Sequence, residues 1–497
     1  MRASAVAASL LSIFATASAG AADANLTKPL SSRILLPSTF KPPQVFKNVN
    51  LLRNINLEKG YSRETINVVI ENIDKNAQDE YFLPFEAGIV DNVGGLEVRD
   101  KKEPDTGLFE VELVEYDTYS STQFFRIRLP KPLKFSAQQT LSISYALLSA
   151  FRPLPATINQ VDKQYLVHTF SAYSPSAYET LKQKTKLKLP TTDIPDHTPI
   201  PSSLNTEGHE DPQRQGSTFT YGPYRPVPAG TVHPVRVRYE FTKPLLHATL
   251  LERDVEVSHW GGNLATEERF WLRNNGAQLE NHFSRVSWAT TSYYNPPTSA
   301  LRELKMPLRV GASNPYFIDD IGNVSTSRFR SSPREAHLEL KPRYPVFGGW
   351  KYSFRVGWDA DLKHFLRRAG GSEGYVLKVP FLEGPKQPEG IEYERVEVRV
   401  ILPEGATNIN YETTVPLIKA ETSLHRTFMD TVGRTVLKLT AVNAVDEFRD
   451  RDLFVTYDQP FLASLRKPLT IFVGMLAVFA GAWGLGKVDT SIGKRGK

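Results

Sequence analysis

The stretch Val396-Glu-Val-Arg-Val400 alternates apolar and charged side chains at every second residue. Side chains of a β-strand point alternately to the two faces of its sheet, so this pattern predicts a strand with one buried and one exposed face. The same alternation occurs earlier in the chain, at residues 109–113, 125–129, 141–145 and 235–239. Such strands are typical of antiparallel sheets packed face to face, so we expect a mostly β protein with sandwich-like domains.

One segment shows helical spacing instead. Apolar residues stand at 362, 365, 366 and 369, with Asp359 or Asp361 near the start and Gly370-Gly371 at the end. An acidic residue before a helix and glycines after it are common capping signals. The segment therefore predicts a helix packed on a sheet as an insertion.

The length of 497 residues is too great for one hydrophobic core, so two folded domains of roughly 200 residues each are expected. Residues 190–228 are rich in Thr, Ser, Pro, Asp and Gly and lack apolar periodicity, which predicts a polar loop or linker. We place the first domain at 23–244 and the second at 245–466. The polar segment is alternatively a surface loop of the first domain, because a strand at 235–240 would close that domain's sheet.

Both ends of the chain carry apolar segments. Arg2, an apolar run at 5–17 and small residues after it have the order of a cleaved signal peptide, predicted over residues 1–22. Residues 469–486 carry no charge and would span about 27 Å as a helix, which predicts a transmembrane helix at 467–486. This arrangement places the bulk of the chain in the lumen or outside the cell, and a short cytosolic tail at 487–497.

The composition excludes several classes of chemistry. No cysteine is present, which removes thiol catalysis and Cys-type zinc sites, and implies domains stabilised by burial alone. The net charge of +6 is small against 60 basic and 54 acidic residues, and no basic block suits nucleic acid. No zinc-protease, serine-nucleophile or phosphate-loop motif occurs.

Two short motifs resemble functional ones but stand in a different context. Asp450-Arg-Asp452 matches a cation-binding Asp-x-Asp, yet no nucleotide-binding βαβ pattern surrounds it, so a charged strand edge is favoured. His259 beside Trp260 suggests a ligand or sugar platform, but no second His stands at metal-ligand spacing, and a packed pair at a strand end is favoured. We therefore predict no catalytic, cofactor-binding or metal-binding residues.

Other residues suggest modification and packing. Asn25-Leu-Thr27 and Asn323-Val-Ser325 are glycan acceptor motifs, and Asn323 is the stronger candidate because it lies in a polar, turn-like stretch. Asn25 is weaker because it lies beside the predicted cleavage site. In the predicted span, Gly474, Ala477 and Gly481 place small residues near one helical face, where a partner helix can pack closely.

A string of aromatic residues and glycines runs from Tyr344 to Trp350 and suits either a corner between strands or an exposed binding loop, the corner being favoured. It belongs to a set of five strings in which the chain resembles the ribophorin I family, at 256–261, 320–327, 342–351, 401–406 and 430–434. The resemblance is strong from residue 239 onward and weaker over 48–228. It puts the family's glycan site on Asn323, and the short tail is similar to that of fungal members.

This resemblance implies a function. The family is a non-catalytic subunit of the endoplasmic reticulum oligosaccharyltransferase, which transfers oligosaccharide from dolichyl diphosphate to Asn in Asn-x-Ser/Thr of nascent proteins. Its implied role is to scaffold the multi-spanning catalytic subunit, which holds the active site and metal, and to present acceptor chains. The implied partners are the other subunits, nascent polypeptide and the translocon. The implied location is the endoplasmic reticulum membrane, in single-pass type I topology.

Two other classes stay open. A cell-surface adhesion protein or receptor would share this topology and the β-sandwich ectodomain, although such proteins more often contain disulfides. A luminal glycosidase or transferase would need a pair of carboxylates that converge only in the fold, which sequence spacing does not exclude.

Overall fold

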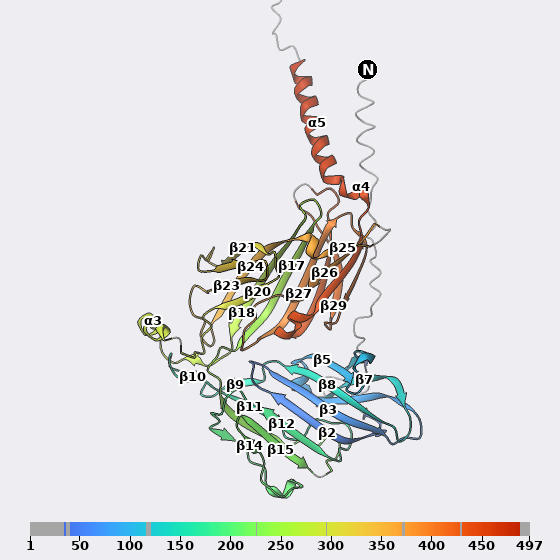
Figure 1. Cartoon of the computed structure of the whole chain (residues 1–497), viewed down its shortest axis with the longest axis vertical. Coiled ribbons are helices and arrows are strands. Elements are labelled where there is room, and N and C mark those ends of the chain that lie inside the picture. The colour runs from blue at the N-terminus through green and yellow to red at the C-terminus, as the bar shows by residue number, and fades with distance from the viewer. Residues whose placement is uncertain are drawn as a thin grey trace, which may run out of the picture.

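The computed structural model describes residues 34–35, 40–115, 121–224, 226–294, 296–369, 373–427 and 430–487. Strands gather in two lobes, and a long helix leaves the second lobe at the end away from the first (Figure 1). The predicted signal peptide, Asn25 and residues 488–497 of the predicted tail lie outside the described residues.

The N-terminal lobe is built on a seven-stranded sheet, which runs in the order β14 (Gln213–Gln215), β15 (Thr218–Tyr224), β12 (Gln183–Lys188), β2 (Phe46–Asn56), β3 (Ser62–Asn72), β8 (Gln138–Leu147) and β5 (Val93–Asp100). A four-stranded sheet shares one core with it, in the order β1 (Ile34–Leu35), β6 (Glu110–Glu115), β7 (Thr122–Leu133) and β4 (Gln78–Glu86). A second sheet shares another core, in the order β13 (Asp196–His197), β16 (Pro234–Glu240), β11 (Tyr165–Ser171) and β9 (Phe151–Pro153).

The C-terminal lobe repeats this plan around one large core. Its seven-stranded sheet runs in the order β21 (Ser313–Asp319), β24 (Lys351–Asp361), β18 (Asn263–Asn274), β17 (Leu246–Ser258), β27 (Ile391–Glu404), β30 (Arg434–Val445) and β29 (Lys419–His425). Two smaller sheets share its core, namely β20 (Leu304–Leu308), β23 (Ala336–Leu340) and β22 (Arg328–Ser331), and β25 (Leu366–Arg368), β26 (Gly374–Pro380), β31 (Asp452–Asp458) and β28 (Thr407–Thr413).

The mostly β prediction is confirmed, and the alternating residues behave as expected. Val396, Val398 and Val400 are fully buried, and so are Leu141 and Ile143. Two long pairs depart from the antiparallel expectation, because β12 runs parallel to β2 and β17 runs parallel to β27. Residues 190–228 contain β13, β14 and β15, and β15 is hydrogen-bonded within the seven-stranded sheet of the N-terminal lobe.

The predicted helix at 362–369 is wrong. The side chain of Asp361 accepts a hydrogen bond from the Lys363 N–H and begins a single 3-10 turn, Leu362–His364. The chain then becomes β25, which pairs with β26. An isolated helix this short is marginal in water, and strand pairing with burial of Phe365 outweighs its local spacing.

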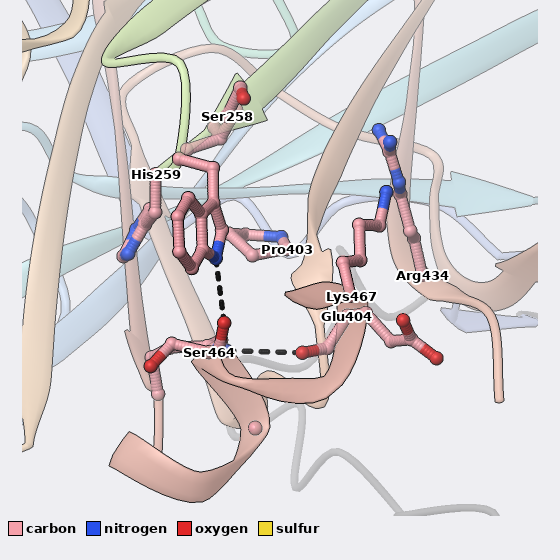
Figure 2. Close-up of a pocket in the computed structure, with 11 residues that line it drawn as sticks. Ser258, His259, Pro403, Glu404, Arg434, Ser464 and Lys467 are labelled. Carbon is pink, nitrogen blue, oxygen red and sulfur yellow. Dashed lines mark hydrogen bonds between the residues drawn. The ribbon is translucent and has the colours of Figure 1, made fainter. Parts of the chain in front are cut away.

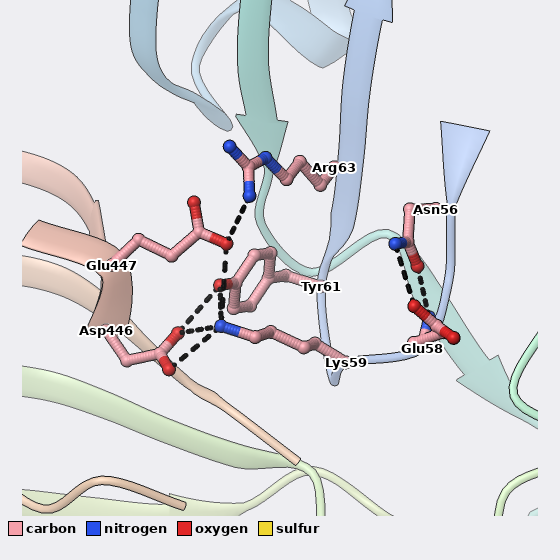
Figure 3. Close-up of polar contacts among 7 residues, drawn as sticks. All are labelled: Asn56, Glu58, Lys59, Tyr61, Arg63, Asp446 and Glu447. Carbon is pink, nitrogen blue, oxygen red and sulfur yellow. Dashed lines mark hydrogen bonds and ion pairs between the residues drawn. The ribbon is translucent and has the colours of Figure 1, made fainter. Parts of the chain in front are cut away.

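The two lobes meet through a polar network and close backbone packing. Lys59 Nζ lies 3.0 Å from Asp446 Oδ2, and the Tyr61 hydroxyl donates to Asp446 Oδ1 at 2.7 Å (Figure 3). Arg63 pairs with Glu447 at 2.8 Å on the same side. Beside these groups, Tyr61 also joins the apolar core of the C-terminal lobe. A short bridge adds to the contact, since β10 (Thr157–Ile158) pairs with β19 (Gln278–Leu279).

The helices are few and lie outside the sheets. α2 (Ala87–Val90) follows β4, and α3 (Arg285–Tyr293) projects from the side of the molecule (Figure 1). After β31, the short α4 (Phe461–Ser464) leads into α5 (Arg466–Gly486). Among the described residues, α5 is the one helix long and apolar enough to cross a membrane, and none of its apolar window is buried.

Candidate functional site

Three of the five strings meet beside the start of α5. The segments 256–261, 401–406 and 430–434 contribute to a cavity of about 60 Å³ between the C-terminal lobe and α4 (Figure 2). Its lining comprises Val257, Ser258, His259, Trp260, Pro403, Glu404, Arg434, Gln459, Ala463, Ser464 and Lys467. Together with Asp430, we call these residues the helix-base site.

Glu404 holds the turn that precedes β30. One of its carboxylate oxygens, Oε1, accepts hydrogen bonds from the N–H of Thr431 at 2.9 Å, the N–H of Val432 at 2.6 Å and the Thr431 hydroxyl at 2.5 Å. Burial alone would raise the pKa of Glu404, but these hydrogen bonds outweigh it and the pKa lies below its ordinary value. The side chain is therefore an ionised cap that fixes the shape of this turn.

Asp430 connects the same turn to the first turn of α5. Its Oδ1 lies 3.0 Å from Lys467 Nζ, and its side chain is fully buried. The other oxygen accepts hydrogen bonds from the N–H and hydroxyl of Thr427. Burial opposes ionisation, yet the Thr427 hydrogen bonds and the Lys467 charge lower the pKa of Asp430 to about 2. An ion pair thus ties the membrane-span candidate to the C-terminal lobe.

Trp260 makes a second connection. Its indole N–H donates to the carbonyl oxygen of Ser464, 2.6 Å away at the end of α4 (Figure 2). Trp260 is 65% exposed, so the prediction of a packed pair is wrong for this residue, because the turn after β17 reaches outward to α4. His259 does pack, with Nε2 2.8 Å from the Tyr457 hydroxyl and its ring against Tyr375.

Replacement of Asp430 by asparagine is expected to lower stability by about 1 to 3 kcal/mol, because Lys467 loses its charged partner. The folded pKa, about 2, lies below the ordinary 3.8, so the stabilising effect is complete above pH 3.8 and disappears as pH falls toward 2. The difference in Tm between Asp430→Asn and the parent should therefore be constant from pH 5 to pH 8. A difference that shrinks over that range would contradict this assignment of the ionised carboxylate.

The two remaining strings also meet each other, at the turn that carries Asn323. Arg343 forms a bidentate pair with Asp319, at 2.7 Å from Nε to Oδ2 and 2.9 Å from Nη2 to Oδ1. The hydrogen bond and charge of Arg343 lower the pKa of Asp319 to about 2. Arg343 also donates to the carbonyl oxygens of Gly322 and Asn323 at 3.3 Å. The Asn323 residue is exposed, as attachment of a glycan requires.

The aromatic string at 344–350 forms a corner, as predicted. Val346 and Phe347 are buried, and the Phe347 ring packs against Trp288 and Trp350. Gly348 allows the corner to close, because a Cβ there would lie 2.0 Å from the carbonyl oxygen of Ala277. The string therefore packs against the strand end at 276–279 and does not form an open binding loop.

The remaining residues singled out in the sequence lie on α5 and at the start of β31. Gly474 and Gly481 lie on α5 with open space around them, and Ala477 lies on the same helix, so their role in helix packing stays a prediction. Asp452 pairs with Arg309 and Lys378 at the start of β31. Within the described ranges, no group of three or more His, Cys, Asp or Glu side chains is arranged to hold a metal ion.

Comparison with known proteins agrees with this pattern of strings. The sequence profile of the family described as Ribophorin I matches residues 46–486. This chain belongs to the ribophorin I family. The match covers both lobes and α5, so the family relationship includes the helix-base site.

Two similar proteins are named dolichyl-diphosphooligosaccharide–protein glycosyltransferase subunit 1. The Schizosaccharomyces pombe protein is 29% identical over 424 residues, which cover 85% of this chain and 90% of that protein. The Caenorhabditis elegans protein is 33% identical over 398 residues, covering 79% of this chain and 62% of that protein. A solved structure of yeast LTA4 hydrolase matches 42% of this chain and 31% of that protein with a TM-score of 0.27 at 11% identity, which is too distant for an argument about function.

Sequence reasoning missed the connection of the strings to α5. Glu404 lies in the string 401–406 and Asp430 in the string 430–434. The residues that connect them to α4 and α5, namely Gln459, Ser464 and Lys467, lie in none of the five strings. The Gln459 side chain donates to the Glu404 carbonyl oxygen at 3.0 Å and completes the site. A signal did exist, since an acidic residue in a string and a basic residue at the start of the span are natural ion-pair partners.

Proposed function

We propose that this chain is a non-catalytic subunit of the oligosaccharyltransferase complex, which links oligosaccharide from dolichyl diphosphate to asparagine in Asn-x-Ser/Thr. The main support is the family match across 46–486 together with relatives named as subunit 1 of that glycosyltransferase. The role is protein N-glycosylation as an accessory subunit.

The proposed location is the endoplasmic reticulum membrane, with α5 as a single span and both lobes in the lumen. The helix-base site supports this arrangement, because Asp430–Lys467 and Trp260–Ser464 attach the start of α5 to the C-terminal lobe. Both lobes then lie on the same side of the span (Figure 1). Asn323 lies on that side with them, because it stands between β21 and β22 of the C-terminal lobe.

The proposed mechanism is that of a scaffold. A helix in the membrane binds the multi-spanning catalytic subunit and other subunits, while the attached lobes stand over the membrane and present nascent polypeptide. The connection between α5 and the C-terminal lobe gives the lobes a defined position relative to the span. Contact with the translocon is part of the same proposal, through the lobes or the span.

Purification of the tagged full-length chain in mild detergent tests this proposal. We expect a multi-spanning subunit to co-purify and the preparation to transfer oligosaccharide to an Asn-x-Thr peptide, with activity lost when that subunit is absent. Recovery of the chain alone, or with cell-surface proteins and no transfer activity, would reject the proposal and favour an adhesion protein or receptor.

A further prediction concerns Asn323. The change Asn323→Gln should remove one glycan, because the exposed Asn323 side chain supplies the nitrogen to which a glycan is attached in Asn323-Val-Ser325. Intact-mass measurement before and after glycosidase treatment reports the loss. Ser325→Thr keeps the acceptor motif and is the matched control, and Asn25→Gln tests the weaker site in the same way. An unchanged mass in Asn323→Gln would show that this asparagine carries no glycan.

Helix packing gives another prediction. The changes Gly474→Leu and Gly481→Leu should reduce co-purification of the other subunits, because larger side chains keep a partner helix at a distance. Leu476→Phe enlarges a residue on another face of α5 and should leave co-purification unchanged. Equal recovery of the complex with both kinds of variant would contradict the assigned face.

A further inference from the structure

A group of exposed apolar residues lies at the base of α5. Phe461, Leu462 and Leu465 are 70%, 79% and 38% exposed, and Trp260, in the turn beside α4, is 65% exposed. Large apolar side chains that gather on a protein surface mark a contact with another molecule or with a membrane. We call these four residues the apolar rim.

The packing of α4 explains why its large residues point outward. Ala463 is buried and packs on the C-terminal lobe, since a Cβ at Gly405 would lie 2.7 Å from the Ala463 Cβ. A helix turns by about 100° per residue, so positions 461, 462 and 465 share one side of α4 and position 463 lies on the other. The lobe therefore holds α4 by its smallest residue and leaves the large apolar residues uncovered.

Trp260 adds an aromatic ring to the rim. Its indole N–H donates to the Ser464 carbonyl oxygen at 2.6 Å, so the polar atom of the ring has its partner within the protein. The exposed surface of the ring is therefore apolar. Tryptophan is enriched at membrane–water interfaces, where such rings lie at the level of the lipid headgroups.

The place of the rim in a bilayer follows from α5. With α5 as the span, the uncharged residues 469–486 cover about 27 Å as a helix, close to the hydrocarbon thickness of about 30 Å. Leu469 then lies at the edge of the hydrocarbon. Leu465 lies about 6 Å before it along the helix axis, and α4 bends away from that axis (Figure 1). The headgroup layer is about 5 to 8 Å thick, so the rim lies within it.

The basic residues at the start of α5 agree with this depth. Arg466 and Lys467 are the first two residues of the helix and follow the rim directly. Long basic side chains near the ends of spans reach the headgroup level with their charges. The base of α5 thus combines apolar residues, an indole ring and cations at one depth, which is the composition of a segment that lies in a membrane interface.

We propose that the apolar rim inserts into the headgroup layer of the bilayer, on the side of the lobes, and holds the end of the C-terminal lobe against the membrane surface. The inference rests on the proposed function for one point, that α5 is the span. It adds a second contact with lipid beside α5, which fixes the height of the C-terminal lobe above the membrane. A helix of another subunit is the competing occupant of the rim, and it would have to displace lipid at this depth.

Spin labelling of the full-length chain in phosphatidylcholine nanodiscs tests the inference, because the chain has no cysteine and each label stands alone. Leu462→Cys carries the nitroxide in the rim. Val478→Cys, 72% exposed on α5, gives the reference for lipid, and Val286→Cys, 78% exposed on α3, is the matched reference for water. Collision of the nitroxide with oxygen reports lipid, and collision with a water-soluble nickel chelate reports water. We expect the oxygen-to-nickel ratio at Leu462 to lie nearer to that of Val478.

A second variant asks whether the rim itself causes the insertion. Phe461→Glu in the chain labelled at Leu462→Cys should shift the ratio toward the water reference, because a carboxylate resists transfer out of water. A ratio at Leu462 equal to that at Val286, or no shift with Phe461→Glu, would overturn the inference.

Photo-crosslinking distinguishes lipid from a protein occupant. Benzoylphenylalanine at position 462, in the chain purified with its co-purifying subunits and placed in the same nanodiscs, should form an adduct with phospholipid. An adduct with another subunit in its place would overturn the inference. If Val478 reads lipid and Leu462 reads water, this inference fails alone, whereas Val478 in water rejects the proposed span together with it. Insertion of Leu462 in a preparation without oligosaccharide transfer rejects the proposed role in glycosylation and leaves the inference standing.

Discussion

Replacement of Glu404 by alanine is expected to destabilise the C-terminal lobe by about 2 to 4 kcal/mol, because three part-buried hydrogen bonds lose their common acceptor together. The donors are the N–H groups of Thr431 and Val432 and the Thr431 hydroxyl, all bound by one oxygen of a side chain that is 5% exposed. Their turn also contains Asp430, so the attachment of Lys467 and α5 is lost with it. Thermal unfolding and limited proteolysis near residue 430 measure both effects.

Glu404→Gln is the matched control for this experiment. Glutamine keeps an oxygen at the position of Oε1, so the three hydrogen bonds remain possible and the expected loss is about 1 kcal/mol. If the alanine and glutamine variants have equal stability, the carboxylate does not hold the turn. Recovery of the other subunits should follow the same order, lowest for Glu404→Ala, because in the proposed arrangement this turn attaches the C-terminal lobe to α5.

Gly94→Ala should have the other large effect, at the contact between the lobes. A Cβ at Gly94 would lie 1.9 Å from the carbonyl oxygen of Asn443, a distance that requires the two backbones to move apart. The Asn443 side chain donates to the carbonyl oxygens of Asp91 at 2.6 Å and Val93 at 3.1 Å, so these bonds would also be disturbed. We expect a loss of about 1 to 3 kcal/mol and a larger radius of gyration in small-angle scattering.

Gly88→Ala is the control, because a Cβ there would meet nothing within 4 Å. It should leave both stability and radius of gyration unchanged. If Gly94→Ala also leaves them unchanged, then backbone packing does not hold the lobes together. The polar network of Lys59, Tyr61, Arg63, Asp446 and Glu447 (Figure 3) would then be the main contact.

These contacts connect the N-terminal lobe to the C-terminal lobe, and the C-terminal lobe to α5. The N-terminal lobe is joined to the C-terminal lobe at Gly94 and Asp446, and the C-terminal lobe is joined to α5 at Asp430 and Trp260. The proposed scaffold role requires such joints, because a scaffold holds its partners at fixed positions. Three of the family-like strings contribute to the joint at the base of α5.

Local sequence pattern by itself predicted the strands, the long apolar helix and the family of this protein. The period of two residues predicted the strands of both lobes, because burial of one sheet face dictates alternation whatever the partner strand is. The uncharged run at 469–486 predicted α5, since a span needs length and apolarity alone. The five strings by themselves indicated the family, because each is a run of neighbouring residues that the chain carries whatever its fold.

Tertiary structure decided what local pattern does not contain. Residues 362–369 have helical spacing, yet Leu366–Arg368 form β25 and pair with β26, because long-range hydrogen bonds and burial exceed the small helical preference of a short segment. The parallel pairs β2–β12 and β17–β27 depend on crossovers that local alternation does not specify. Val432 and Lys467, which bind Glu404 and Asp430, lie far from them in the sequence, so only folding brings these groups together.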